Sequence, residues 1–220
     1  GALCLFTSVA TIAADPARSD PAQAGMSAQR LEVITEVFKR EIEQGKLPGV
    51  VMVVARKGRL VFDQALGMQD KQRGTPMPRD AIFRLYSMSK PMVSVAAMML
   101  VEDGKLVLTD PVSKYLPQMK SLQVSVAKAD AEFAKVTYSK VAAEREMTVY
   151  DLLRHTAGLA YGEITANVPV KEAYTKAALF NPGAREFDSR DMTPAEQVER
   201  LAAAPLAHQP GTVWEYSLAS

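Results

Sequence analysis

The stretch that decides the fold is residues 82–102, Ile-Phe-Arg-Leu-Tyr-Ser-Met-Ser-Lys-Pro-Met-Val-Ser-Val-Ala-Ala-Met-Met-Leu-Val-Glu. A short β-rich run, residues 82–85, leads directly into a long segment with Ala, Met, Val and Leu around its whole circumference. Asp103-Gly104 then gives a stop signal. We therefore predict a buried central helix over residues 88–102, with Ser87 at the junction of strand and helix.

Ser87 and Lys90 form a Ser-x-x-Lys pattern at the start of this predicted helix. One helical turn separates them, so both side chains project from the same face. A lysine at the head of an apolar helix loses solvation, which disfavours its charged form and lets it accept the proton of a serine hydroxyl. The motif alone leaves open the alternative that Ser87 is an ordinary N-cap.

The same pattern occurs again at Ser125 and Lys128, inside the polar, Lys-rich segment 118–146. Nothing in that segment would desolvate the lysine, so we interpret this second pair as part of a solvated face. We predict that the whole segment is a surface insertion.

Working outward, the spacing of apolar residues predicts an amphipathic helix that begins at Ser27 and stops at Gly45. Residues 49–56 and 59–66 are β-rich runs on either side of Lys57-Gly58, which predicts an antiparallel hairpin. Thr148 with Asp151, and Thr193-Pro194 with Glu196, are helix-start signals. The predicted fold class is α/β or α+β, with an antiparallel sheet flanked by helices and an all-helical region over residues 106–206.

Composition excludes several classes of partner. The 220 residues are 48% hydrophobic and carry 26 Lys and Arg against 25 Asp and Glu, a net charge of +1. No global field exists to attract polynucleotides or anionic lipid, so we expect no nucleic-acid partner and no stable membrane insertion. The only histidines, His155 and His208, have no cysteine beside them, so we expect no metal and no cofactor. No pattern fixes an oligomeric state.

Residues 1–14 are apolar and end in small residues, which is typical of a truncated signal peptide. Residues 15–25 have the composition of a linker. We expect residues 1–25 to be a signal-peptide remnant and linker, and residues 26–220 to form one domain of an exported, periplasmic protein. A buried first helix in a cytoplasmic protein is the alternative. The only cysteine, Cys4, precedes this domain, which therefore has no disulfide.

Three further observations concern residues 83–91, residues 152–159 (Leu-Leu-Arg-His-Thr-Ala-Gly-Leu) and residues 210–217 (Pro-Gly-x-x-Trp-x-Tyr-Ser). In this order, these segments resemble the signatures of the class C β-lactamase and family VIII carboxylesterase superfamily. Residues 104–112 are similar to its linking segment. The combination is far more specific than any single motif. It implies a β-lactamase/transpeptidase-like fold from about Met26 to the last residue.

The resemblance also implies roles for particular residues. Ser87 would be the acylated nucleophile, Lys90 its proton partner and Tyr216 the phenol that shuttles the proton to the leaving group. A phenol titrates near ~10 in water, so ammonium groups or a dry environment must assist it. Packing beside Trp214 is the alternative for Tyr216. The resemblance implies a structural role for His155, with a triad base as the alternative.

The sequence departs from the superfamily in two places. The third element, a Lys-Thr-Gly, His-x-Gly or Trp-Gly-Gly triplet on a C-terminal strand, is absent, so we expect an incomplete domain and little or no activity from these 220 residues alone. Leu218 stands where class C β-lactamases have the Asn of Tyr-x-Asn, and an apolar side chain cannot hydrogen-bond the side-chain amide of a β-lactam.

These observations predict a serine hydrolase that cleaves carboxylic esters through an acyl-serine intermediate, with weak side activity on β-lactams. Its substrate would be a small ester or β-lactam. One alternative is a class C-type β-lactamase or D-Ala-D-Ala carboxypeptidase. Another is a penicillin-binding sensor module that is acylated without turnover.

Overall fold

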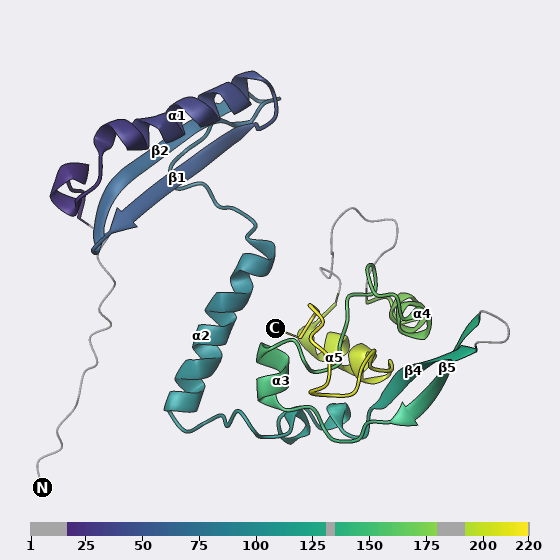
Figure 1. Ribbon diagram of the computed structural model, residues 1–220. Helices are drawn as coiled ribbons and strands as arrows, with labels where there is room; N and C mark the ends of the chain where they lie inside the picture. The colour runs from purple at the N-terminus through teal and green to yellow at the C-terminus, as the bar shows by residue number, and fades with distance from the viewer. Residues whose placement is uncertain (1–16, 131–134, 180–191, 220) are drawn as a thin grey trace, which may run out of the picture. The chain divides into compact units, whose positions relative to one another are not determined.

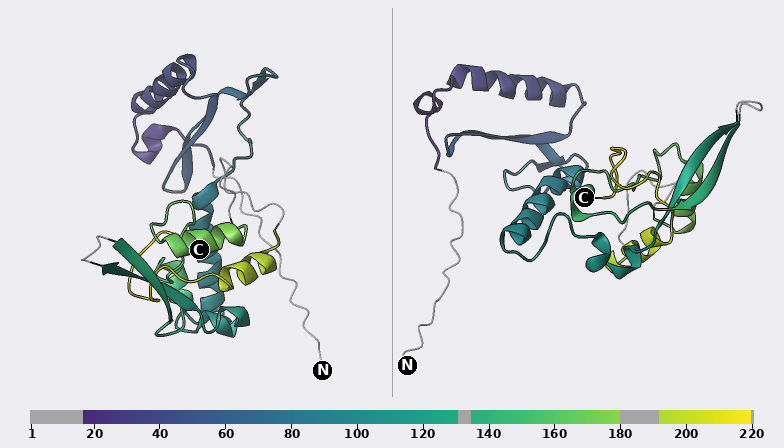
Figure 2. Two further views of the ribbon diagram at one scale, coloured as in Figure 1. Left: turned by 90° about the vertical axis from the view of Figure 1, so that its right-hand side faces the viewer. Right: turned by 60° about the horizontal axis from the view of Figure 1, so that its bottom comes forward.

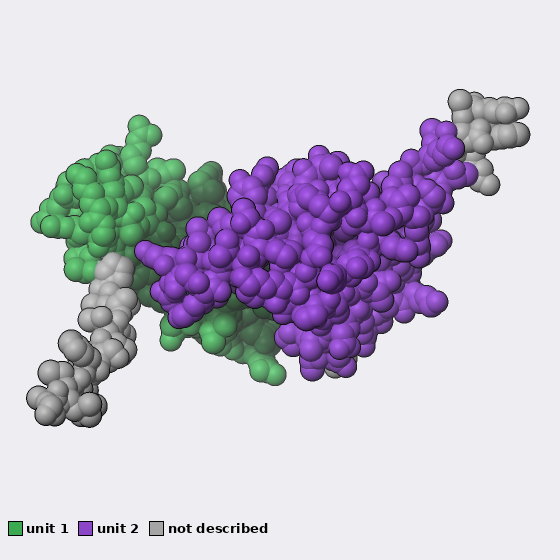
Figure 3. Space-filling model, turned by 90° about the horizontal axis from the view of Figure 1, so that it is seen from below, with its two compact units in different colours: residues 1–84 green, residues 85–220 purple. Residues whose placement is uncertain are grey.

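The computed structural model describes residues 17–130, 135–179 and 192–219 (Figure 1). The predicted signal-peptide remnant, residues 1–14, lies outside the described residues. The chain divides into two compact units, residues 1–84 and 85–220 (Figure 3). Each unit has its own hydrophobic core.

The first unit is a helix packed on an antiparallel sheet. Helix α1 (Ala28–Glu43) lies along the sheet β1–β2–β3, whose strands are Gly49–Arg56, Arg59–Asp70 and Thr75–Pro76 (Figure 1). The Ser27 side chain accepts a hydrogen bond from the Arg30 N–H, which confirms the predicted N-cap. Lys57 and Gly58 both have positive φ, 52° and 69°, as a two-residue hairpin turn requires, so the predicted hairpin is confirmed.

Ordered structure in this unit begins earlier than the composition indicated. The 3₁₀ turn Pro21–Ala24 precedes α1, its Asp20 side chain caps it, and Ala24 is buried. Arg18 forms a β-bridge with Leu60 and an ion pair with Asp63. Proline and alanine in this segment are compatible with a turn that packs on the sheet, so composition alone did not distinguish it from a linker.

The second unit holds α2 (Ser89–Glu102), α3 (Val149–Leu153), α4 (Val168–Lys176) and α5 (Pro194–Ala202), with the hairpin β4 (Gln123–Asp130) and β5 (Lys135–Ala142). The 3₁₀ turns Val112–Lys114 and Pro117–Met119 connect α2 to the hairpin. Its core joins the turns, the base of the hairpin and helices α4 and α5. Figure 2 shows the hairpin extending away from these helices.

Local start signals were reliable in this unit. Thr148 with Asp151, and Thr193 with Glu196, each form a capping box, and Pro194 occupies the first turn of α5. Both helices begin where the sequence predicts. Helix α4 was missed, although Asn167 caps it and Pro169 lies in its first turn.

The hairpin β4–β5 corrects the prediction for residues 118–146. This segment is a regular antiparallel ladder from Gln123↔Ala142 to Asp130↔Lys135, and Val124 and Ser125 at its base are buried. The region predicted to be all-helical therefore contains two strands. The polar residues of β4 do not alternate regularly, so the pattern does not reveal a strand. The base of β4 enters the core because it pairs with Leu206.

Helix α2 has the predicted extent but not the predicted burial. None of its residues is buried among the described part of the chain, and Met92, Val95 and Met99 are 64%, 61% and 61% exposed. Side chains that are apolar on every face favour burial, but burial itself requires other elements around the helix. No helix in the described ranges is both long enough and apolar enough to cross a bilayer.

Candidate active site

Ser87 lies on the 3₁₀ turn Tyr86–Met88, which leads into α2, and it is exposed. Residues 82–85 are not a strand, so the predicted strand-to-helix junction is a loop-to-helix junction. Tyr86, just before Ser87, has a φ of 47°, a conformation that costs a non-glycine residue about 1–2 kcal/mol. Such local strain is often retained at functional sites, where it fixes the direction of one side chain.

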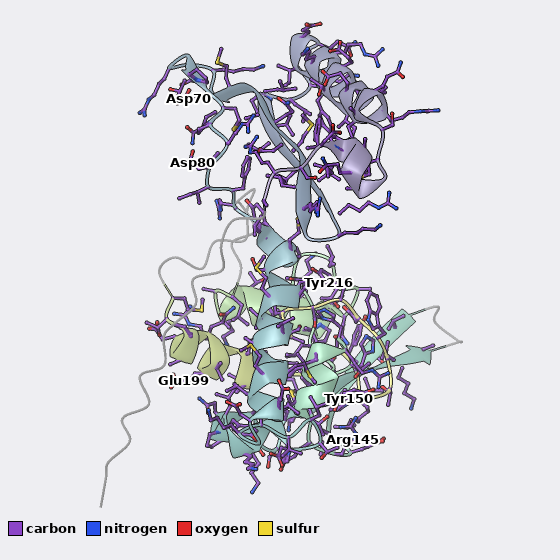
Figure 4. The ribbon with its side chains drawn as sticks, turned by 90° about the vertical axis from the view of Figure 1, so that its left-hand side faces the viewer. Asp70, Asp80, Arg145, Tyr150, Glu199 and Tyr216 are labelled. Atoms are coloured by element: carbon purple, nitrogen blue, oxygen red, sulfur yellow. The ribbon has the colours of Figure 1, made fainter. Side chains whose placement is uncertain are left out.

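Lys90 lies one turn further along and meets two phenols from distant parts of the second unit. Its half-buried Nζ donates a hydrogen bond to the Tyr161 hydroxyl at 3.2 Å. Nζ also lies 5.3 Å from the ring centroid of Tyr216 and 5.9 Å from that of Tyr161, within the range of cation–π attraction. Figure 4 shows Tyr216 beside the N-terminal end of α2. The structure therefore brings the predicted residues Lys90 and Tyr216 together.

Tyr161 is the site residue that the sequence reasoning missed. Its ring lies 5.6 Å from that of Tyr216, and its hydroxyl contacts the amine directly. Tyr161 follows closely on the Leu-Leu-Arg-His-Thr-Ala-Gly-Leu segment, and that adjacency is the one signal that could have indicated it. The tyrosine itself belongs to no spacing pattern with Lys90, 71 residues earlier.

His155 holds the segment that carries Tyr216. Its carbonyl accepts from the Glu215 N–H at 2.9 Å, and its Nδ1 accepts from the Ser217 N–H at 3.3 Å. The imidazole ring lies 4.8 Å from the Tyr216 ring. His155 has a φ of 58°, so the chain turns sharply after α3 to make these bonds. These contacts favour the structural role implied for His155.

An ion pair between Asp151 and Arg145 stabilises the turn at His155. Asp151 accepts two hydrogen bonds from Arg145, at 2.6 and 3.0 Å, and one from the Thr156 hydroxyl at 3.0 Å. The Thr156 carbonyl in turn accepts from the Gly211 N–H at 2.7 Å. Gly211 has a φ of 85°, which other residues rarely adopt, and a Cβ there would also displace the Arg145 guanidinium. The buried carboxylate and the Tyr216 segment are thus joined through residues 155 and 156.

Burial lowers the pKa of His155, and the positive charge of Lys90 lowers it further. The neutral ring also lets Nδ1 accept the hydrogen bond from the Ser217 N–H. The pKa of His155 in the folded state lies below the ordinary value of 6.5, so its contribution to the stability of the protein is fully present above that pH. This contribution is lost as the pH falls through the folded pKa. Protonation would also place a second cation near Lys90.

We expect this loss to disappear in His155→Asn. Asparagine tolerates a positive φ and offers an acceptor oxygen, but it does not titrate. Chemical denaturation of the full-length protein from pH 7 to pH 5 is the measurement, with the wild type losing more stability than the variant. Parallel pH profiles for the two proteins would contradict the expectation.

The second Ser-x-x-Lys pattern is not a site of the same kind. Ser125 is buried, with 2% exposure, rather than part of a solvated face, so that interpretation was wrong for the serine. Lys128 is exposed, as expected. On a β-strand, residues three apart point to opposite faces, so strand β4 cannot bring this amine to this hydroxyl. Ser87 lies on the 3₁₀ turn Tyr86–Met88 and Lys90 in the first turn of α2, where a spacing of three residues brings side chains to the same side of the helix axis.

Comparison with known proteins identifies the fold and the family. The mixed arrangement of helices and antiparallel sheet is that of the β-lactamase/transpeptidase-like class, as predicted. The chain belongs to the β-lactamase family, whose sequence profile, described as Beta-lactamase, matches residues 34–220.

Relatives of this chain include esterases. It is 33% identical over 201 residues to esterase EstB from Burkholderia gladioli, covering 91% of this chain and 45% of that protein. It is 28% identical to lovastatin esterase from Penicillium rubens, over 81% of this chain and 42% of that protein. Among solved structures, it matches EstCE1, a hydrolase with promiscuous acyltransferase activity, with a TM-score of 0.66, 31% identity, and coverage of 87% of this chain and 44% of that chain. The chain thus spans less than half the length of these relatives.

Proposed function

We propose that the protein is a serine hydrolase that cleaves carboxylic esters through an acyl-Ser87 intermediate. The observation that carries this proposal is the meeting of Lys90 Nζ with two phenols, those of Tyr161 and Tyr216, one helical turn from an exposed serine. An amine and a phenol together can accept a hydroxyl proton and return it, which is what acyl transfer from a serine requires. The esterases among its relatives support the same reaction class.

The proposed reaction has two halves. The Ser87 hydroxyl gives its proton to the Lys90–Tyr216 pair as its oxygen bonds to the ester carbonyl carbon, and the proton passes to the alcohol oxygen as the C–O bond of the ester breaks. Water then attacks the acyl-serine and gives its proton to the same pair. Loss of the carboxylic acid returns the proton to Ser87.

Leu218 supports an ester over a β-lactam. Its side chain is partly buried and packs against the core of the second unit. The leucine side chain cannot hydrogen-bond the side-chain amide of a β-lactam. That amide would therefore add no binding energy at this position.

Two substrates test the proposal with the full-length protein. We expect hydrolysis of p-nitrophenyl acetate to exceed hydrolysis of a chromogenic cephalosporin. Preference for the cephalosporin would favour a β-lactamase, and stoichiometric labelling of Ser87 without release would favour a sensor module. If neither substrate reacts and Ser87 is not labelled, the proposal fails.

The two tyrosines are expected to differ in importance. Tyr216→Phe removes the proposed proton shuttle, so kcat for ester hydrolysis should fall about 10²-fold. Tyr161→Phe removes the hydroxyl that bonds to Lys90 Nζ and helps to hold it in place, so kcat should fall about tenfold, with KM little changed. Steady-state kinetics of both variants measure the difference, and Tyr150→Phe, on the exposed side of α3, is the control. An equal decrease in kcat for Tyr161→Phe and Tyr216→Phe would contradict the expectation that Tyr216 matters more.

A further inference from the structure

The two phenols that meet Lys90 are carried by two segments of the second unit, residues 155–161 with Tyr161 and residues 206–217 with Tyr216. Backbone hydrogen bonds join these segments along their length. They run from the Ala207 N–H to the Gly158 carbonyl at 2.8 Å, from the Gly211 N–H to the Thr156 carbonyl at 2.7 Å, and from the Glu215 N–H to the His155 carbonyl at 2.9 Å. The position of Tyr216 therefore depends on how residues 206–217 fold against residues 155–161.

A side-chain pair closes the loop 209–214 just before Tyr216. His208 and Glu215 flank this loop, and His208 Nε2 lies 2.5 Å from a carboxylate oxygen of Glu215. A carboxylate only accepts hydrogen bonds, so Nε2 carries the hydrogen that joins the two side chains. Residues 211–214 are exposed, so little packing would keep the loop closed without this pair.

His208 is a fixed point for the pair because its backbone lies against Gly158. Gly158 has a φ of 84°, and a Cβ there would lie 2.1 Å from the His208 carbonyl oxygen. Ala207, the preceding residue, is buried. The His208 and Glu215 side chains are 32% and 25% exposed, so solvent and salt screen this pair less than a pair on the open surface.

We propose that His208 and Glu215 are positioning residues that hold the Tyr216 phenol against Lys90. Glu215 is fixed at two points, by its N–H on the His155 carbonyl and by its carboxylate on His208, and Tyr216 follows it directly. The inference rests on the proposed ester hydrolysis, in which neither residue touches the substrate. A small displacement of a reacting group from its productive geometry lowers the rate of the chemical step far more than it weakens substrate binding.

Steady-state hydrolysis of p-nitrophenyl acetate by the full-length protein tests the proposal. We expect kcat to fall about tenfold in Glu215→Ala and in His208→Ala, with KM little changed. The double variant should lose no more than either single variant, because both substitutions break one contact. Glu215→Gln keeps an acceptor oxygen for Nε2 and should retain at least about a third of the wild-type kcat. Glu199→Ala, at an exposed position on α5, is the control and should match the wild type.

Crystal structures of the wild type and of Glu215→Ala give a readout that does not require turnover. Lys90 Nζ lies 5.3 Å from the Tyr216 ring centroid, and we expect this distance to exceed about 6 Å in the variant. If the wild type hydrolyses no ester, the proposed function fails and this distance alone decides the inference. The inference is overturned if the Tyr216 ring keeps its place, if the alanine variants keep the wild-type kcat, or if their losses add independently.

Thermal melting separates positioning from folding. Assays run at temperatures where each variant is fully folded exclude a loss of rate that arises from unfolding. Under those conditions, a low kcat in Glu215→Ala that Glu215→Gln does not share supports the proposed role. An equally low kcat in both variants would contradict a role based on the hydrogen bond to His208.

Discussion

Replacing Ser87 by alanine is expected to lower kcat/KM for p-nitrophenyl acetate by at least about 10⁴-fold in the full-length protein. The reason is chemical, because no other group at this position can form the acyl bond that divides hydrolysis into two easier steps. Removing an acylated serine therefore removes the pathway rather than weakening one contact. Steady-state kinetics measure the loss, and mass spectrometry after a phosphonate probe should find label on wild-type Ser87 only.

Two further variants make this result specific. Ser89→Ala, two residues later and also exposed, should retain wild-type kinetics because its side chain lies outside the proposed chemistry. Lys90→Met keeps the length and apolar character of the side chain but removes the amine, so it should also be severely impaired. If Ser87→Ala kept more than a tenth of the wild-type rate, with normal folding by circular dichroism, the acyl-serine mechanism would be excluded.

Replacing Asp151 by alanine is expected to destabilise the protein by about 2–4 kcal/mol, because it removes several hydrogen bonds to a buried carboxylate together with a helix cap. The carboxylate side chain is only 5% exposed. It accepts bonds from Arg145, from the backbone and hydroxyl of Thr148, and from the Thr156 hydroxyl. Its loss therefore leaves buried donors without partners and removes the capping box of α3. Urea denaturation measures the change.

Asp151 should also make the stability of the folded protein sensitive to acid. Burial alone would raise the pKa of Asp151, but the hydrogen bonds from Arg145, Thr148 and Thr156 outweigh burial and hold the pKa well below its ordinary value of 3.8. The stabilisation is therefore complete above pH 3.8 and is lost as pH falls from there through the folded pKa. Asp151→Asn should show a flatter stability profile in that range.

An exposed aspartate provides the comparison for Asp151. Asp103 pairs with Lys105, and both side chains are more than half exposed, so Asp103→Ala should cost less than about 1 kcal/mol. A similar cost at positions 103 and 151 would show that the capping network contributes little. Loss of ester hydrolysis at temperatures where Asp151→Ala stays folded would indicate that the network also positions Tyr216.

Signals confined to a few neighbouring residues were read correctly from the sequence. Ser27, Thr148 and Thr193 were recognised as helix starts because an N-cap side chain bonds to backbone only two or three residues away. Lys57-Gly58 was recognised as a turn for the same reason. The fold class and the family followed from the order of motifs along the chain.

Errors arose where the outcome depended on contacts between distant segments. The apolar circumference of α2 predicted a buried helix, yet Met92 and Met99 are exposed among the described residues. The polar segment 118–146 suggested a solvated surface, yet Ser125 is buried because strand β4 pairs with Leu206. The composition of a segment shows which environments it is compatible with. Whether the segment is buried depends on which other parts of the chain pack against it.

The sequence by itself determined where helices α1, α3 and α5 and the first hairpin begin, the Ser87–Lys90 spacing and the β-lactamase-like class. Each of these depends on short-range geometry or on motif order. Only the tertiary structure decided that Tyr161 and Tyr216 meet Lys90, that His155 holds the Tyr216 segment, and that Ser125 bonds to Leu206. These contacts join residues far apart in the chain, and no local pattern encodes which distant side chain will fill a given space.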